Sequence, residues 1–478
     1  RQNILNLGLA LQKVAREAHL AGDTTGASAA NAEATRHLRA LAESESEESS
    51  ELLCGVLMDA SILAMSSGDL NGATAASHEA SLIARSIVNA NPDDVDALRL
   101  LNSALDRAAE ISETAGDLET AWGAATESLD SARDLLRFVP DAPQLQASVC
   151  DALVRHARIG LALLQGTRAH QSSSEAVSIA RDLVAGNPGD HGAIGSLAAA
   201  LHCHGVASRT LGDLSTARAA HHEAATMSRA WIARDGSSAQ SVGDLATALE
   251  GLAATELALG DTAAALVHAN EVLDLQRSLT SNDPQNYRGL RSVSIALDVI
   301  ADVNTADGRV GEARAALAEC VAIHQRLLGL DSGNSTAHRD AGLTLIKISA
   351  LDAATGNPNA AIRSLDEAIK LFRGLCQDSA GARARRDLLL SLDRLGSIYL
   401  ELNDRDSAMR TFTEAAGLCR QNLAATPDDA DALSDLGTCL QSLVATGIRM
   451  GDLDMARRAS LESVDVTRRA LVAEPSRV

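Results

Sequence analysis

The fold is decided by a unit that residues 92–140 spell out as PDDVDALRLLNSALDRAAEISETAGDLETAWGAATESLDSARDLLRFVP. The first half of this unit has the pattern of an amphipathic helix. Asp93 or Asp94 can cap that helix, because an aspartate carboxylate accepts hydrogen bonds from the first free backbone N–H groups. Apolar residues then recur at helical spacing on one face, namely Leu101, Leu105, Ala108 and Ile111.

A tight turn and a second helix complete the unit. Gly116 ends the first helix, since glycine adopts a positive φ angle at little cost. Pro140 ends the second helix, because proline lacks the N–H group that would continue the hydrogen-bond ladder. Each helix has about 20 residues and is therefore roughly 30 Å long. The apolar face of the second helix holds Trp122, Leu129, Leu135 and Leu136.

The same unit recurs ten times along the chain. An alanine follows the turn of each copy, and successive alanines are 46 to 48 residues apart: Ala27, Ala73, Ala121, Ala169, Ala217, Ala265, Ala313, Ala361, Ala408 and Ala456. A leucine stands 16 residues before each alanine: Leu11, Leu57, Leu105, Leu153, Leu201, Leu249, Leu297, Leu345, Leu392 and Leu440. A glutamate stands six residues after it: Glu33, Glu79, Glu127, Glu175, Glu223, Glu271, Glu319, Glu367, Glu414 and Glu462. Chance does not produce ten matches at three offsets, so the repeat is established.

The ninth copy resembles a known repeat family. Leu392-x2-Leu395-Gly396-x2-Tyr399 is followed there by Ala408-x3-Phe412 and then by Pro427. This pattern is similar to the tetratricopeptide repeat signature W-x2-L-G-x2-Y…A-x3-F…P, with a leucine in the place of the tryptophan. The resemblance covers all ten copies, although most of them have lost the aromatic rings. Each copy is about 14 residues longer than the family's unit of roughly 34, which adds about two turns to each helix.

The resemblance implies an all-α fold: a right-handed superhelical solenoid of ten antiparallel helix pairs. We expect a single domain over residues 1–478. The expected repeats are approximately 1–46, 47–92, 93–140, 141–188, 189–236, 237–284, 285–332, 333–380, 381–427 and 428–478. A solenoid of this family offers a concave wall lined by its first helices, which implies binding of a protein or peptide partner.

The composition argues against several classes of function. The formal net charge is −21 and no basic stripe is present, so we expect no nucleic-acid binding. No apolar run approaches the roughly 20 residues of a membrane span. Catalytic, phosphate-binding and metal-binding motifs are missing, which predicts a protein that is not an enzyme and needs no cofactor. The seven cysteines are scattered and odd in number, as expected for free thiols in the cytoplasm, and the preference for arginine over lysine suggests a bacterial source.

Charged residues at the family's groove positions are the candidate partner-binding residues. They are Asp106, Glu110, Glu113, Arg158, Arg209, Glu250, Asp298 and Asp302. One interpretation is a partly acidic groove for a basic or helical segment. The other is an ordinary solvated helix face in an acidic chain.

Two further features have competing interpretations. The repeated glutamate either binds a ligand or pairs with an arginine or a helix end of the neighbouring repeat, and we favour the pairing. The second feature is a metal-like cluster of His202, Cys203, His204, His221 and His222. Neighbouring residues of a helix point about 100° apart, so the His-Cys-His run cannot bind one ion from a single face. We therefore expect core or surface histidines rather than a zinc site.

The two ends of the array look different in the sequence. The last helix has a polar outer face formed by Asp454, Arg457, Arg458, Asp465, Arg468 and Arg469. The first helix has apolar side chains on more than one face, so we expect another domain, a partner or a second copy to cover the N-terminal end. Long arrays of this kind resemble those joined to caspase-like, TIR or NTPase domains in bacterial signalling and defence proteins. The alternative to a free scaffold is therefore the sensor or regulatory region of a larger effector.

Overall fold

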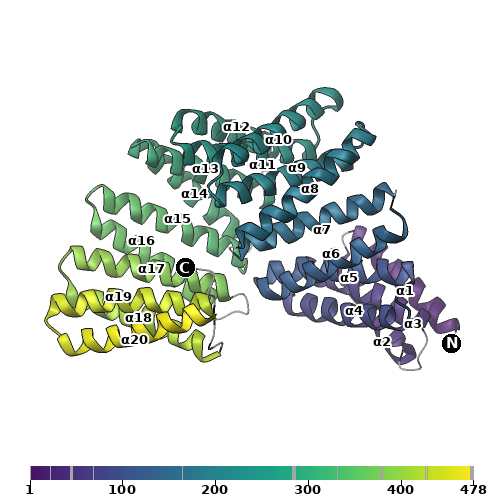
Figure 1. Cartoon of the computed structure of the whole chain (residues 1–478), viewed down its shortest axis with the longest axis horizontal. Coiled ribbons are helices and arrows are strands. Elements are labelled where there is room, and N and C mark those ends of the chain that lie inside the picture. The colour runs from purple at the N-terminus through teal and green to yellow at the C-terminus, as the bar shows by residue number, and fades with distance from the viewer. Residues whose placement is uncertain are drawn as a thin grey trace. The chain divides into compact units, whose positions relative to one another are not determined.

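The computed structural model describes residues 2–21, 23–42, 47–67, 69–140, 142–163, 165–281, 287–330, 332–376, 381–425, 427 and 429–473. These residues form twenty α-helices and no β-strand, which confirms the all-α fold. The helices follow one another as ten pairs (Figure 1), with these bounds: α1 Gln2–Leu20, α2 Thr24–Ala42, α3 Glu47–Ser66, α4 Leu70–Ala90, α5 Val95–Ala115, α6 Leu118–Phe138, α7 Pro143–Ala162, α8 Gly166–Gly186, α9 His191–Thr210, α10 Leu214–Asp235, α11 Ala239–Leu259, α12 Thr262–Ser281, α13 Tyr287–Ala306, α14 Val310–Leu330, α15 Ser335–Ala354, α16 Pro358–Leu375, α17 Gly381–Glu401, α18 Arg405–Ala425, α19 Ala430–Met450 and α20 Leu453–Ala473.

The turn inside each pair follows from the glycine-aspartate pattern. Gly116 has a φ angle of 81°, in the left-handed region that glycine adopts most easily. Asp117 then caps α6, because its side chain accepts a hydrogen bond from the backbone N–H of Thr120. The short turn reverses the chain, so the two helices of a pair pack antiparallel.

The chain divides into two compact units, Arg1–Leu275 and Gln276–Val478, which we call unit 1 and unit 2 and describe separately. The repeat alanines form the core of both units. Nine of them are fully buried and Ala456 is 6% exposed. A side chain this small lets the paired helices approach closely, so the alanine repeat is a packing signal in the structure, as expected from the sequence.

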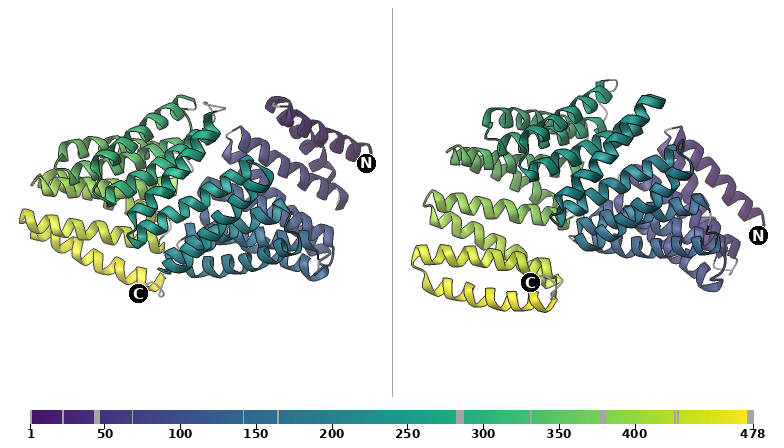
Figure 2. Two further views of the ribbon diagram at one scale, coloured as in Figure 1. Left: turned by 90° about the horizontal axis from the view of Figure 1, so that it is seen from above. Right: turned by 45° about the horizontal axis from the view of Figure 1, so that its top comes forward.

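First and second helices pack differently within each unit. First helices contact each other directly at α1–α3, α3–α5, α7–α9 and α9–α11 in unit 1, and at α15–α17 and α17–α19 in unit 2. Among the described residues, no pair of second helices packs comparably. Grooves therefore remain between neighbouring second helices, and Figure 2 shows the helices of unit 1 from two further directions.

Helix α3 has the composition of a membrane span but the surroundings of a core helix. The stretch Glu48–Ser66 is long and apolar enough to cross a membrane by length and composition. Its residues Leu53, Val56 and Leu57 are 3%, 0% and 2% exposed in the core of unit 1. The expectation that no apolar run approaches the length of a membrane span is therefore wrong for this stretch, part of which packs in the core of unit 1.

The expected contrast between the two ends is wrong. Helix α1 exposes Ile4, Leu7, Leu9 and Val14, as its sequence suggests. Helix α20 also exposes apolar side chains, namely Leu453, Leu461, Val464, Leu471 and Val472. The outer face of α20 is mixed because these residues alternate with the arginines that had suggested a polar face.

Candidate functional site

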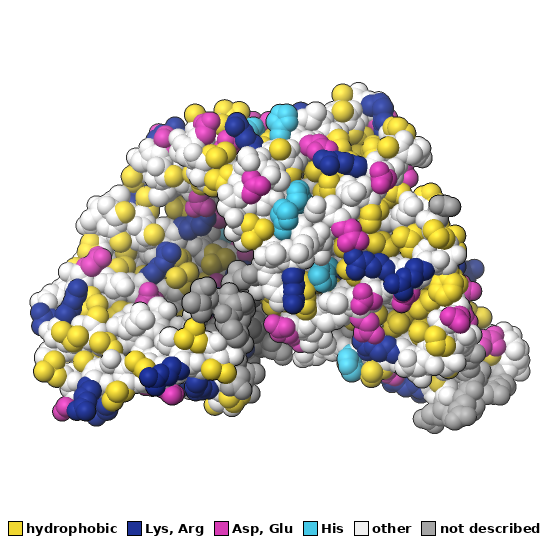
Figure 3. All heavy atoms as spheres, in the orientation of Figure 1, with side chains coloured by type: hydrophobic (Ala, Val, Ile, Leu, Met, Phe, Trp, Pro, Cys, Tyr) yellow, Lys and Arg dark blue, Asp and Glu magenta, His cyan; other side chains and the backbone are white. Residues whose placement is uncertain are grey.

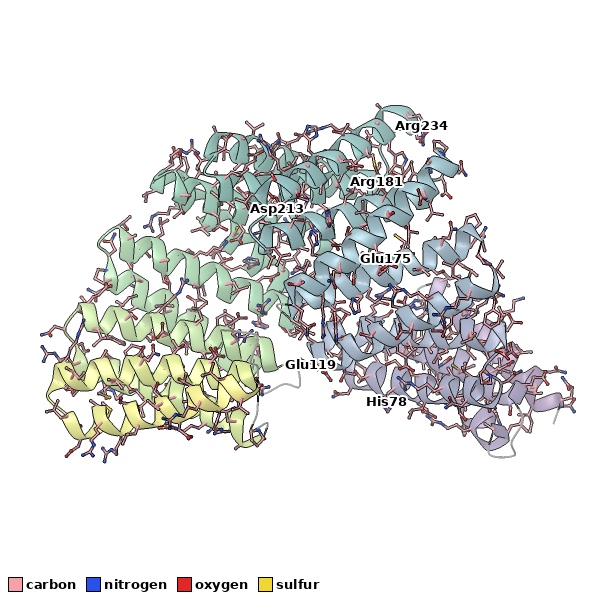
Figure 4. The ribbon with its side chains drawn as sticks, in the orientation of Figure 1. His78, Glu119, Glu175, Arg181, Asp213 and Arg234 are labelled. Carbon is pink, nitrogen blue, oxygen red and sulfur yellow. The ribbon has the colours of Figure 1, made fainter. Side chains whose placement is uncertain are left out.

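The repeated glutamates form a ladder of ion pairs between neighbouring second helices. Among the described residues, eight of the ten glutamates pair with an arginine of the preceding repeat: Arg39–Glu79, Arg85–Glu127, Arg133–Glu175, Arg181–Glu223, Arg229–Glu271, Arg277–Glu319, Arg373–Glu414 and Arg420–Glu462. Arg181 Nη2 lies 2.6 Å from Glu223 Oε2, and Arg133 Nη2 lies 2.7 Å from Glu175 Oε2. Figure 4 labels Glu175 and Arg181, the two residues through which α8 takes part in successive pairs. The structural interpretation of the glutamate is thus confirmed.

The arginine half of this ladder was missed in the sequence. It stands 12 residues after the repeat alanine in nine of the ten copies, and the seventh copy has Gln325 at that position. Counting at this offset would have found it. Figure 3 shows acidic and basic side chains interspersed over the face that it draws.

Six of the eight candidate partner-binding residues are engaged inside the protein. Arg155 Nε lies 2.6 Å from Asp106 Oδ1, and Arg158 Nη2 lies 2.6 Å from Glu113 Oε2. These two pairs join the first helices α5 and α7. Glu110 pairs with Arg107 on its own helix.

The other ion pairs formed by candidate partner-binding residues lie in unit 2. Lys347 Nζ lies 2.6 Å from Asp298 Oδ2 and 2.8 Å from Asp302 Oδ2. Each of these first-helix carboxylates therefore already has a cation, which removes most of its attraction for a basic partner.

A second set of first-helix ion pairs was not foreseen. Arg291 Nε lies 2.6 Å from Asp340 Oδ2, and Arg339 Nε lies 2.6 Å from Asp387 Oδ2. In unit 1, Asp59 accepts hydrogen bonds from Gln12 and Arg16. The sequence signal is weak, because the acidic partners recur in only some of the copies.

The other two candidate residues, Arg209 and Glu250, have no ion pair in the part of the chain that the structure describes. Arg209 lies on α9, and its Nε atom is buried without an acceptor. Glu250 lies on α11, the next first helix, where burial raises the pKa of its carboxyl group to about 7. The structure thus separates these two residues from the six that stabilise the repeats themselves.

Further unpartnered polar groups lie close to them in the sequence. Among the described residues, thirteen buried side-chain polar atoms have no hydrogen-bond partner, and nine of them belong to residues between His202 and His268. Asp244 is one of these, and burial raises the pKa of its carboxyl group to about 6. Such atoms are costly to bury, so their concentration on α9 to α12 marks this part of unit 1 as the candidate site.

His221, the most buried histidine of the metal-like cluster, is a packing residue, whereas His222 is exposed. His221 is fully buried in the slot where the ninth repeat has Phe412. A Cβ atom added to Gly205 would lie 2.5 Å from the His221 ring, and one added to Gly251 would lie 2.3 Å from it. Burial, together with the smaller effect of the charges of His202, Arg209 and His204, lowers the pKa of His221 to about 3. In the described part of the chain, no three His, Cys, Asp or Glu side chains are grouped to hold a metal ion.

Open grooves lie between second helices of unit 1. One, of 690 Å³, is lined by residues of α2, α3 and α4, and another, of 380 Å³, is lined by residues of α8, α9 and α10. Both are bordered by a pair of the ladder, Arg39–Glu79 in the first and Arg181–Glu223 in the second. In the larger groove, Asn31 and Ala64 stand in slots where the family has aromatic rings.

Comparison with known proteins agrees with the helix-pair repeat. Residues 295–334 and 391–422 each match a family model described as tetratricopeptide repeat. A search of the curated proteins finds no significant match. Similar solved structures include the apo form of RapI, which is 11% identical over 68% of this chain and 99% of that chain, with a TM-score of 0.46.

Two further similar structures are BtubC from P. vanneervenii and a tetratricopeptide repeat protein from Parabacteroides merdae. BtubC is 18% identical over 55% of this chain and 93% of that chain, with a TM-score of 0.39. The Parabacteroides protein is 14% identical over 71% and 98%, with a TM-score of 0.37. The two family matches, together with the ten helix pairs, show that this chain is a repeat protein of the tetratricopeptide superfamily.

Proposed function

We propose that the chain is a protein-interaction scaffold that binds a partner segment on the first helices α9 and α11 of unit 1. The observation behind this proposal is the contrast between paired and unpaired charges. Asp106, Glu113 and Asp298 each have an internal cation, whereas Arg209 and Glu250 have none among the described residues. A repeat fold of this type is typically non-enzymatic, so binding is the activity we assign to it.

The unpaired groups define the chemistry of the partner. An unpaired carboxylate that is partly desolvated gains more from a cation than one that is fully hydrated, because part of its desolvation cost is already present in the free protein. Glu250 and Asp244 therefore favour lysine or arginine in the partner. Arg209 favours a carboxylate or a backbone carbonyl that accepts from its free N–H group. The partner we expect is a protein segment with basic residues and at least one acceptor.

The setting of this interaction is also part of the proposal. All seven cysteines are free, and six of them are buried. Free buried thiols are typical of a reducing compartment, and we therefore place the protein in the cytoplasm of a bacterium. We propose that binding at this site needs no metal or cofactor and involves no nucleic acid or membrane.

The test is a selection of displayed random peptides on the intact chain. Enriched peptides should contain lysine or arginine, and Glu250→Gln should weaken their binding about tenfold, as expected for the loss of one desolvated charge pair. Glu119→Gln removes the same charge from the exposed start of α6, which Figure 4 labels, and should leave binding unchanged. Equal binding to both variants, or enrichment of peptides without basic residues, would contradict the proposal.

A second candidate function is the regulatory region of a larger bacterial effector. It is favoured by the apolar side chains that α1 exposes, of which Leu9 and Val14 are 53% and 52% exposed. An attached domain or a partner would remove this surface from water. Sequencing the whole reading frame around residues 1–478 tests this alternative. A caspase-like, TIR or NTPase domain there would support it, and a reading frame without such a domain on either side of residues 1–478 would reject it.

A further inference from the structure

The groove between α2 and α4 contains a buried polar side chain, Asn31, whose hydrogen-bonding capacity is only partly used within the described residues. We call it the α2–α4 groove, and its volume is 690 Å³. Its floor and walls are formed mainly by small residues, including Ala32 on α2, Ala60 on α3 and Ala75 on α4. The volume lies within the range of about 300–1,000 Å³ that is typical of ligand-binding pockets.

Asn31 supplies an unpartnered hydrogen-bond acceptor in this groove. It stands in the slot where the ninth repeat has Phe412, lines the groove, and is 3% exposed. Its Nδ2 atom donates to the backbone oxygen of Val56 at 3.3 Å. Its Oδ1 atom is buried and receives no hydrogen bond. In the equivalent slot of the fourth repeat, by contrast, the hydroxyl group of Ser173 donates to the backbone oxygen of His170.

Two charged residues of the groove lining, Arg36 and Asp69, have no ion pair in the described part of the chain. The carboxylate of Asp69 instead caps α4 by accepting a hydrogen bond from the backbone N–H of Gly72. Arg39 is tied to Glu79 by the ion pair that bridges α2 and α4. Arg36 lies one helical turn from Arg39 and is exposed. The groove therefore combines a buried acceptor, the exposed cation of Arg36 and small apolar side chains, and the carboxylate of Asp69 at its edge is engaged in capping α4.

We propose that the α2–α4 groove binds an extended peptide segment with small side chains and one acidic residue. An extended segment has free backbone N–H groups and can donate one to Asn31 Oδ1, whereas the N–H groups of a helix are already bonded within it. The acidic residue pairs with Arg36. Along α2 the lining runs from Ser28 to Ala40, about 18 Å at 1.5 Å per residue. That length holds five or six extended residues at about 3.3 Å each.

This site is separate from the one proposed on α9 and α11, since it lies on second helices and selects the opposite charge. The two proposals can therefore fail independently. Glu250→Gln should not affect the α2–α4 groove, and substitutions in the groove should not affect the basic peptides selected by α9 and α11.

The experiment uses fluorescein-labelled, acetylated hexapeptides in which each position is fixed in turn, with binding to the intact chain measured by fluorescence polarisation. We expect a preference for aspartate or glutamate at one position and for glycine, alanine or serine at its neighbours. Asn31→Leu, which removes the acceptor, and Arg36→Glu should each weaken the best peptide about tenfold or more. Ala32→Trp places a ring in the groove from an exposed position and should abolish binding.

Arg457→Glu, an exposed charge reversal in unit 2, is the matched control and should bind like the unsubstituted chain. Circular dichroism of every variant checks that the helices are intact, and Ala32→Trp and Arg36→Glu keep the test decisive if Asn31→Leu unfolds. Binding that survives Ala32→Trp would overturn the proposal. A preference for basic hexapeptides would also overturn it. The same holds if no hexapeptide binds, because Asn31 Oδ1 would then have buried water as its only partner.

Discussion

Replacing His221 by phenylalanine should make unit 1 less sensitive to acid. His221 is fully buried between Gly205 and Gly251, and neither of its ring nitrogens has a hydrogen-bond partner. Its pKa in the folded protein is lowered to about 3 from 6.5. Phenylalanine fits this position, because Phe412 occupies the same slot of the ninth repeat over Gly396.

The magnitude follows from proton linkage. Between pH 6.5 and about 3 the unfolded chain binds a proton at this residue and the folded chain does not, so stability is lost as the pH falls below 6.5. At pH 5 the pH lies 1.5 units below the unfolded value, and each unit is worth about 1.4 kcal/mol. His221 therefore removes about 2 kcal/mol of stability between pH 7 and pH 5, and His221→Phe should retain that amount.

The assay is urea unfolding followed by tryptophan fluorescence at pH 7 and pH 5. Trp122 and Trp231 are the two tryptophans of the chain, and both lie in unit 1, so the signal reports that unit alone. His78→Phe, at the exposed histidine labelled in Figure 4, is the control and should keep the pH dependence of the unsubstituted chain. If His221→Phe loses as much stability on acidification as the unsubstituted chain, the assignment of His221 as a neutral packing residue is wrong.

Three other substitutions test the ladder, the unpaired acid and the packing of small residues. A double-mutant cycle on Arg181→Ala and Glu223→Ala should give a coupling energy below about 1 kcal/mol, because both side chains are more than a third exposed, and a larger value would mean that the ladder holds the repeats together. Glu250→Gln should reduce the loss of stability that unit 1 shows between pH 5 and pH 8 in the same fluorescence assay. The folded carboxyl group keeps its proton up to a pH of about 7 and the unfolded one releases it near 4.5, so the unsubstituted chain loses stability as the pH rises between them. Gly396→Ala should destabilise unit 2 by about 1–3 kcal/mol in thermal unfolding, since the added Cβ would lie 2.5 Å from the Phe412 ring. Gly417→Ala, in a helix with open space around it, should be neutral or stabilising, and equal effects of the two glycine substitutions would contradict the packing argument.

The repeat and its helices could be predicted from the sequence because they rest on local rules repeated ten times. The spacing of Ala121, Gly116 and Leu105 reports helix packing and turn geometry directly. Ten copies of the same offsets leave little room for another fold. The glutamates of the ladder could be predicted in the same way. Their arginine partners were missed, although they also recur at a fixed offset from the repeat alanine.

The candidate site could be predicted only in part, because pairing depends on which residues of neighbouring repeats face each other. Asp298 and Glu250 occupy equivalent positions in their repeats and look alike in the sequence. Lys347 pairs with the first, and no cation pairs with the second among the described residues. The same holds for Asn31, which stands where the ninth repeat has Phe412. The sequence does not show whether its side-chain oxygen accepts a hydrogen bond. The exposed leucines of α20 were missed because the arginines between them dominate its polarity.

Amide hydrogen exchange of the intact chain, with and without a peptide selected by display, tests the assignment of the binding site most directly. A bound segment slows exchange where it covers the backbone or stabilises the helices that it contacts. We predict slower exchange in α9 around Arg209 and in α11 from Asp244 to Glu250, with no change in α5 around Glu110. Slower exchange confined to the paired first helices α5 and α7, or to unit 2, would contradict the assignment of the binding site to the unpaired charges.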